Sequence, residues 1–205
     1  APNSAIIARY ARGRDYHKVM RGRLKTLSQK IKAKVGDFES RPFEDSAPIF
    51  EKSLAENAGM GWVGKHTLLI HKTSGSFFVL GELFTSLELP FDQATTKHCG
   101  SCSACIDICP TQAIVEPYLL DARKCIAYLT IEFQGIIPEE LRRGIGNRVF
   151  GCDDCQLICP WNSFAKTTPI DDFNPRHGLD DIQLIDLWQW DENTFMANTE
   201  GSPLR

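Results

Sequence analysis

The distribution of cysteines constrains this chain more than any other feature. All eight cysteines lie between residues 99 and 159 of a 205-residue sequence. The stretch "CGSCSACIDICP" has the spacing C-x2-C-x2-C-x3-C-P, formed by Cys99, Cys102, Cys105, Cys109 and Pro110. In bacterial-type ferredoxin domains this spacing gives three thiolates to one [4Fe–4S] cube, while the fourth cysteine ligates a second cube. The run therefore predicts a two-cluster iron–sulfur domain.

Zinc and disulfides are the alternatives for so many cysteines. Zinc sites usually pair two C-x2-C knuckles and do not need the x3-C-P tail. Four disulfides would fit a secreted chain, but no signal peptide opens this sequence, and its cysteines are bunched. The bunching favours metal binding in a reducing compartment, and we expect a cytoplasmic location.

A second, shorter run completes the predicted ligand set. "GCDDCQLICPWN" supplies Cys152, Cys155 and Cys159 as C-x2-C-x3-C-P. The exchange of ligands between cubes predicts that Cys159 joins Cys99, Cys102 and Cys105 on the first cluster. Cys109, Cys125, Cys152 and Cys155 then hold the second. Cys125 is thus a displaced ligand, and residues 126–151 are an insertion beside the second cluster. We expect this insertion to bring a cofactor or substrate close to that cluster.

The net charge of −3 conceals a basic N-terminal block. Residues 1–41 contain eleven Lys and Arg but three Asp and Glu, a charge of +8. Such a block suggests a surface that faces a polyanion, although a solvated helix face would explain it as well. No apolar run approaches the roughly 20 residues of a membrane span, so no membrane partner is expected.

The remaining patterns predict a mixture of helices and strands. An apolar stripe with Asp15 before it and Gly36 after it predicts a helix over 15–35. Helices are also expected over 46–59, 121–133, 138–146 and 180–190. Residues 66–71 and 76–84 are predicted to be two strands of a hairpin. The expected class is α+β, an α/β portion followed by a bacterial-type two-cluster ferredoxin domain.

Four stretches together resemble the epoxyqueuosine reductases, a cobalamin-dependent family of queuosine biosynthesis. They are "GRDYH" (13–17), "DSAP" (45–48), "GWVGKH" (61–66) and "NRVFGCDDCQLICPWN" (147–162). The resemblance covers roughly residues 5–200. The family also has an N-terminal segment and a C-terminal helical-repeat region, so we expect the chain to be a piece of a longer protein.

The resemblance implies an activity and its cofactors. Family members reduce epoxyqueuosine to queuosine at the wobble position of tRNA and release the epoxide oxygen as water. Electrons pass from two [4Fe–4S] clusters to base-off cobalamin and then to the epoxide. An external protein supplies the electrons, and we expect a monomer. The implied domains are a cobalamin-binding portion (1–92), the ferredoxin-like domain (93–168) and a linker into the helical repeats (169–205).

The family's proton donor falls on Asp45. The simpler interpretation of D-S-x-P is a helix start, with Asp45 or Ser46 as the N-cap. General-acid work instead needs a carboxyl that keeps its proton near neutral pH.

Further contacts are implied with less support from the residues themselves. The cobalamin-binding motif D-x-H-x-x-G is incomplete because Met20 stands in its Gly position, so His17 is interpreted as a helix-surface or cap histidine. Cobalamin contacts are expected from Ala8, Asp45, His66, Leu69, Leu80, Ala127, Gly151, Cys152 and Asp153. Contacts to tRNA phosphates are expected from Arg9, Arg12, Arg14, Arg142 and Arg143.

Two other functions stay open at this stage. A two-cluster electron-transfer module would explain the cysteines but would leave residues 1–98 without a role. A corrinoid reductive dehalogenase would share the clusters and the cobalamin. Such enzymes typically carry a twin-arginine export signal and a Tyr with a basic partner as the acid, and the sequence shows neither.

Overall fold

The computed structural model describes residues 3–205 and contains helices and short strand pairs. The α-helices are α1 (Tyr16–Val35), α2 (Glu51–Asn57), α3 (Ala104–Asp107), α4 (Ile126–Ile131), α5 (Glu139–Ile145), α6 (Asp154–Leu157), α7 (Leu184–Trp188) and α8 (Glu192–Asn198). The strands are β1 (Ile6–Ile7), β2 (Ser40–Phe43), β3 (Trp62–Val63), β4 (Leu69–Ile70), β5 (Glu82–Thr85), β6 (Ile114–Glu116), β7 (Leu119–Leu120) and β8 (Arg148–Phe150). This mixture is of the α+β class, as predicted.

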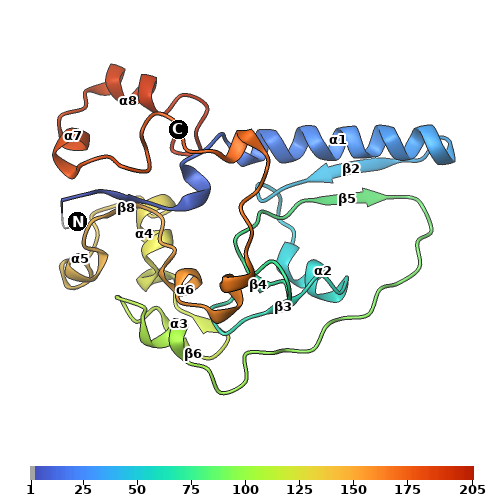
Figure 1. The fold of residues 1–205 in the computed structure, drawn as a ribbon, viewed down its shortest axis with the longest axis horizontal. Helices are drawn as coiled ribbons and strands as arrows, with labels where there is room; N and C mark the ends of the chain where they lie inside the picture. Colours follow the sequence, from blue (N-terminus) through green and yellow to red (C-terminus); the bar gives the residue numbers. More distant parts are fainter. Residues whose placement is uncertain (1–2) are drawn as a thin grey trace.

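Helix α1 begins and ends where the sequence predicts. The Asp15 side chain accepts a hydrogen bond from the amide of His17, and Gly36 ends the helix with a φ of 92°. Cations near the carboxyl end, such as Lys32 and Lys34, suit the helix dipole. The predicted apolar stripe is only partly buried, because Leu24 is covered whereas Val35 is 61% exposed. One side of α1 lies along the β2–β5 pair (Figure 1).

The predicted hairpin over 66–84 is wrong. Strand β4 pairs antiparallel with β3, which precedes it, and β5 pairs antiparallel with β2. His71 and Gly75 do form one isolated antiparallel bridge, but no ladder continues from it. The segment after β5 runs as a long exposed connection to the cysteines (Figure 1).

Three other predicted helices have different bounds. Over 46–59, the helix begins only at Glu51, with Phe50 as its N-cap. Over 121–133, Asp121 caps a 3₁₀ turn (Ala122–Lys124), and α4 follows it. Over 180–190 the helix is shortened to α7.

The pairing of β1 with β8 joins the N-terminal segment to the predicted insertion. The two strands are parallel, with Ile7 opposite Phe150. Ile7, Ala11 and Leu179 form a buried cluster next to this pair. A second cluster, Ile126, Leu129 and Ile145, packs within the insertion, with Cys152 against it. In residues 3–205, no helix has the length and apolar character needed to cross a membrane.

Candidate iron–sulfur and cofactor site

The two C-x2-C-x3-C-P turns have the same backbone conformation. Helix α3 follows Ser103 (φ −118°, ψ 4°), and α6 follows Asp153 (φ −109°, ψ 3°). In each turn the amide of the last cysteine donates to the carbonyl three residues earlier, at 3.3 Å for Cys109 and 3.1 Å for Cys159. The two short helices pack against each other. Superimposing the turns by sequence places Val149 where the first run has Cys99, so the second run lacks one ligand locally.

One group of cysteines lines a cavity of about 460 Å³, and it consists of Cys99, Cys102, Cys105 and Cys159. Burial raises the pKa of the Cys105 thiol, and negative charge on Cys159, Cys99 and Cys102 would raise it further. The structure therefore brings together the four residues predicted for the first cluster.

Cys155 lies close to the other cysteines predicted for the second cluster and also to Cys105 of the first group. The pKa of the Cys155 thiol is raised, and burial is the largest cause. Negative charge on Cys152 and Cys125 raises it further, followed by charge on Cys105 and Cys109. Burial also raises the pKa of Cys152 to about 11. Cys125 comes from the start of α4, and its position beside Cys152 is produced by the fold rather than by sequence spacing.

Each group has the donor chemistry that a [4Fe–4S] cluster requires. Each group offers four cysteine thiols, and cluster binding would deprotonate them. A tetrahedral zinc ion needs its sulfurs about 2.3 Å from one point. In the part of the chain that the structure describes, no group of three or more His, Cys, Asp or Glu converges in that way.

Asp45 does not cap a helix. Its side chain is 59% exposed, and Oδ2 accepts a hydrogen bond from the hydroxyl of Tyr16. Nε2 of His17 lies 3.6 Å from the same oxygen. The backbone at Asp45 has a φ of 28°, and its amide donates to Glu51 Oε1 at 2.6 Å. Ser46 does not cap α2 either, because its hydroxyl donates to the carbonyl of Glu44. The helix-cap interpretation is therefore wrong for both residues.

His17 occupies the first turn of α1, as expected for a surface or cap histidine. Its ring stacks on Tyr16 with centroids 4.0 Å apart, and its Nδ1 lies 2.8 Å from Asp15 Oδ1. Its proximity to Asp45 could not be inferred from sequence spacing.

Four of the residues predicted to contact cobalamin lie together where β1 meets β8. The amide of Ala8 donates to the carbonyl of Phe150 at 2.8 Å, and Asp153 Oδ2 accepts from the amide of Arg9 at 2.8 Å. Gly151 has a φ of 70°, and a Cβ added there would lie 2.6 Å from Ala8 Cβ. Cys152 follows directly. This junction therefore adjoins the second group of cysteines, to which Cys152 belongs.

Tyr10, which the sequence reasoning missed, lies between this junction and Asp45. Its ring meets Tyr16 edge-on with centroids 5.6 Å apart. Burial raises the pKa of Tyr10 to about 12, and the charges of Asp45, Asp153 and Glu132 contribute. No motif in the sequence singles out Tyr10, and only its position next to Arg9, a predicted contact residue, could have drawn attention to it.

The remaining predicted cobalamin contacts are more scattered. His66 lines the cavity of the first cysteine group instead. Leu69 is 3% exposed in β4, and Leu80 and Ala127 are half-buried.

The basic residues predicted to contact tRNA differ in their surroundings. Arg12 is half-buried, and its Nε donates to the carbonyl of Ile7 at 2.7 Å. Arg14 forms an ion pair with Asp172 at 3.0 Å. Arg9, Arg142 and Arg143 are exposed, although Arg9 stacks over Phe77 and Arg142 Nε donates to the carbonyl of Ile137. Arg9, Arg142 and Arg143 are therefore better placed for phosphate than Arg12, which is half-buried, or Arg14, which is exposed but paired with Asp172.

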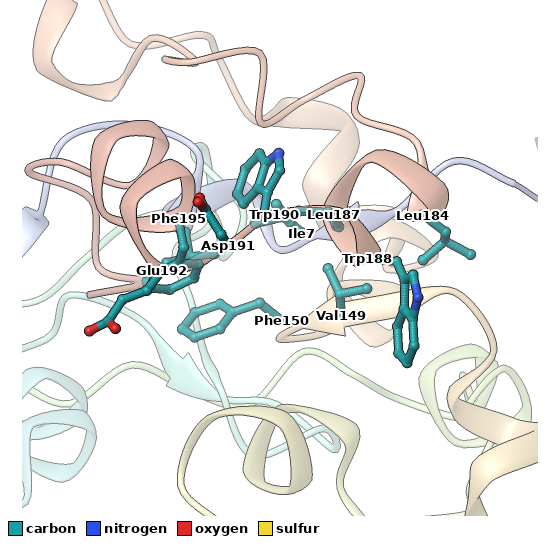
Figure 2. Close-up of a pocket in the computed structure, with 11 residues that line it drawn as sticks. Ile7, Val149, Phe150, Leu184, Leu187, Trp188, Trp190, Asp191, Glu192 and Phe195 are labelled. Carbon is teal, nitrogen blue, oxygen red and sulfur yellow. The ribbon is translucent and has the colours of Figure 1, made fainter.

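A larger cavity of about 600 Å³ lies away from the cysteines, between β8 and the helices α7 and α8 (Figure 2). Trp188, Trp190 and Phe195 project into the view from the helical side, and Val149 and Phe150 from β8. Asp191 and Glu192 are its charged residues, and it contains no cysteine. It therefore does not belong to either cysteine group.

Comparison with known proteins defines the class first. Residues 98–162 match the 4Fe–4S double cluster binding domain, and residues 1–46 match a domain described as epoxyqueuosine reductase QueG, DUF1730. The chain thus contains an iron–sulfur domain of the two-cluster type, as the cysteine spacing predicts.

The particular family follows from sequence similarity that extends over the whole of this chain. The epoxyqueuosine reductase of Pseudomonas aeruginosa is 59% identical over 205 residues, which are 100% of this chain and 57% of that protein. The Xanthomonas campestris enzyme is 60% identical over 201 residues, 98% of this chain and 57% of that protein. The chain thus spans a little over half the length of these relatives. The comparisons confirm the resemblance predicted from the sequence: nearly the whole of this chain is similar to a little over half of these epoxyqueuosine reductases.

Solved structures agree with this relationship. An epoxyqueuosine reductase with an epoxyqueuosine-modified tRNA-Tyr stem loop matches with a TM-score of 0.91 and 31% identity, over 98% of this chain and 54% of the other. The Bacillus subtilis enzyme, described with a catalytic aspartate loop swung out of the active site, has a TM-score of 0.90 and 32% identity. It is matched over 97% of this chain and 52% of its own.

Proposed function

We propose that this chain is part of an enzyme that reduces epoxyqueuosine to queuosine at the wobble position of tRNA. The observation that carries the proposal is the placement of the Ala8–Gly151 junction beside the second cysteine group, with Asp45 linked to it through Tyr10 and Tyr16. The named relatives act in this reaction, and one was solved with a modified tRNA stem loop.

The reaction needs two electrons and two protons. Both carbon–oxygen bonds of the epoxide break, an alkene forms, and the oxygen leaves as water. Two [4Fe–4S] clusters, held by the two cysteine groups, would carry single electrons towards the junction. An external reductant protein would supply them. Adjacent cysteine groups suit this role, since α3 packs on α6.

Base-off cobalamin is the proposed partner of the second cluster. When bound, it would supply low-valent cobalt, a strong reductant for the epoxide. Ala8, Gly151, Cys152 and Asp153 would form the contact surface, in which the absence of a side chain at Gly151 makes room for the methyl group of Ala8. Leu69, Leu80 and Ala127 would add apolar contacts from neighbouring elements. His66 fits this set less well because it lies in the other cavity.

Asp45 is the proposed proton donor. Its carboxylate is anchored on one oxygen by the Tyr16 hydroxyl, while its exposure leaves it open towards a substrate. A carboxyl keeps its proton near neutral pH only where water is excluded, so the bound substrate would have to cover this side chain. The aspartate-bearing catalytic loop described for the Bacillus subtilis relative supports this assignment.

The exposed Arg9, Arg142 and Arg143 are proposed to contact tRNA phosphates, because guanidinium groups position phosphate in pairs of hydrogen bonds. A monomer in the cytoplasm, where thiols stay reduced, completes the proposal. The proposed division is a cofactor-binding portion (1–92), a cluster domain (93–168) and a connecting segment (169–205).

Anaerobic reconstitution tests the proposal directly. The full-length protein is loaded with iron and sulfide, cob(II)alamin is added, and EPR is recorded. We expect a base-off cob(II)alamin spectrum and turnover of epoxyqueuosine-modified tRNA. Two clusters without any bound cobalamin would leave an electron-transfer module. Cobalamin binding with turnover of organohalides, but not of the modified tRNA, would instead identify a reductive dehalogenase.

A further inference from the structure

His66 is a buried histidine that the proposed reaction does not use. It lies between β3 and β4, and its residue is 2% exposed. A Cβ added at Gly64 would lie 3.1 Å from His66 Cε1, so the ring packs closely against the backbone. Its orientation is therefore set by its surroundings.

The hydrogen bonds of the ring determine where its proton lies. The amide of Leu68 donates to Nδ1 at 3.1 Å, which makes Nδ1 the acceptor. A neutral imidazole carries one proton, and with Nδ1 accepting, that proton must be on Nε2.

This N–H has no protein partner. Nε2 of His66 is buried and makes no hydrogen bond within residues 3–205. Buried donors in native proteins are almost always satisfied, and an exception points to a partner that the protein chain does not provide. The free donor of His66 therefore calls for an acceptor inside its own cavity.

The cavity identifies the class of acceptor. His66 lines it together with Cys99, Cys102, Cys105 and Cys159. The neighbouring Lys65 donates from Nζ to the carbonyls of Gly100 at 2.7 Å and Cys102 at 2.9 Å. The segment that carries His66 is thus fastened to the loop that carries two of these cysteines.

We propose that His66 donates a hydrogen bond from Nε2 to a sulfur of the cluster held by Cys99, Cys102, Cys105 and Cys159, and thereby raises its reduction potential. Reduction adds negative charge, and a donor to sulfur stabilises the reduced state more than the oxidised one. His66 is a positioning and tuning residue here, not a ligand. The inference rests on the part of the proposed function that places a [4Fe–4S] cluster in this cavity.

Two substitutions at His66 separate the donor from the rest of the side chain. His66→Asn keeps an acceptor for the Leu68 amide but removes the donor at the Nε2 position. His66→Gln can place its amide NH2 close to the original Nε2. His71→Asn is the matched control, because His71 Nδ1 also accepts from the amide two residues later, at 3.3 Å from Thr73, but in an exposed setting.

The measurement is a potentiometric EPR titration of the reconstituted full-length protein, with iron and sulfide counted for each variant. In His66→Asn we expect one of the two cluster midpoints to become more negative, with at least a threefold change in its reduction equilibrium. The one-electron relation of 59 mV per tenfold converts this change to about 30 mV. His66→Gln should return towards the wild-type value, and His71→Asn should match it.

Unchanged midpoints in a fully loaded His66→Asn protein would overturn the inference while leaving the proposed reaction intact. Failure of the wild type to assemble the first cluster would overturn both. A second measurement does not depend on variants: ENDOR spectra of wild-type protein labelled with ¹⁵N-histidine should show coupling between a reduced cluster and a histidine nitrogen. Absence of any such coupling would likewise overturn the hydrogen bond.

Discussion

The hydroxyl of Tyr16 donates a hydrogen bond to Asp45 Oδ2, although the two residues are 29 positions apart. Tyr16 opens α1, whereas Asp45 lies in the loop before α2. The pKa of Tyr16 is raised by burial and then by this bond, so the phenol stays protonated and continues to donate. The carboxylate is thus fixed to the rigid first turn of a long helix, which is how a loop residue can be held for one chemical task.

Asp45→Asn is expected to reduce turnover of the modified tRNA by about 10²- to 10⁴-fold, the usual contribution of a general acid. The amide still accepts from Tyr16 but cannot supply the proton. Cluster content should not change, because Asp45 belongs to neither cysteine group, and Asn has nearly the same shape as Asp, so cob(II)alamin should still bind. Asp92→Asn, in the exposed connection, is the control. Full activity of Asp45→Asn would remove Asp45 from the chemistry.

Loss of Cys125 should remove one cluster and leave the other. In Cys125→Ala, iron per chain is expected to fall from about eight to about four, the content of a single cube. Cys99→Ala should give the same loss but a different remaining EPR signal, because it affects the other cysteine group. Iron, sulfide and EPR measured on both variants check this. Two intact clusters in Cys125→Ala would show that another ligand completes the second site.

Gly151→Ala should destabilise the fold through two separable effects. The left-handed φ of 70° costs a non-glycine residue about 1–2 kcal/mol. The new Cβ would also meet Ala8 Cβ at 2.6 Å, and overpacking of this kind typically costs about 1–3 kcal/mol more. Gly178→Ala isolates the first effect, because Gly178 has a φ of 69° and nothing within 4 Å of the added Cβ.

Urea denaturation of the two variants at equal cluster content measures the difference. The further substitution Ala8→Gly in the Gly151→Ala protein should recover part of the loss, since it removes the opposing methyl group. Equal destabilisation by Gly151→Ala and Gly178→Ala would show that the contact with Ala8 relaxes without cost.

The raised pKa of Tyr10 predicts that the protein loses folding stability at alkaline pH. Its pKa is raised to about 12 in the folded protein, chiefly by burial, compared with 10 in an unfolded chain. Between these values the unfolded chain ionises first, so the stabilisation is complete below pH 10 and is lost as the pH rises to 12. Tyr10→Phe should flatten this part of the stability curve, whereas the exposed Tyr128→Phe should not. Denaturant unfolding from pH 9 to 12 measures the free energy of unfolding at each pH. The same dependence on pH in wild type and Tyr10→Phe would contradict the prediction.

The cysteine groups and α1 could be predicted from the sequence. The cysteines are assigned by their spacing and number, and the helix is marked by residues at its own two ends. The spacing of the first run and the exchange of the C-P cysteines assign all eight residues to two sets, and the cysteines of the first set line one cavity. Helix α1 carries its own start and end signals in Asp15 and Gly36.

Pairings between segments far apart in the chain could not be predicted, because no sequence pattern marks which strand pairs with which. The partner of β5 is β2, some forty residues earlier, whereas the turn residues at 72–75 suggested a neighbouring strand. D-S-x-P at 45–48 matched a helix start, but the chain turns at Asp45 with a positive φ and delays α2 until Glu51. The role of His66 needed the position of its ring, because sequence alone does not show which nitrogen lacks a partner.

The parallel pairing of β1 with β8 has a consequence for biosynthesis. Ile7 cannot find Phe150 until the ribosome has added more than 140 further residues. At about 5–20 residues per second, that is a wait of roughly 7 to 29 s. Five of the eight cysteines, from Cys99 to Cys125, precede β8 in the chain, so the nascent chain presents these five before the cofactor junction can close. Neither ligand set is complete at that point, so the last ligands of both clusters and the strand that closes the junction leave the ribosome almost together.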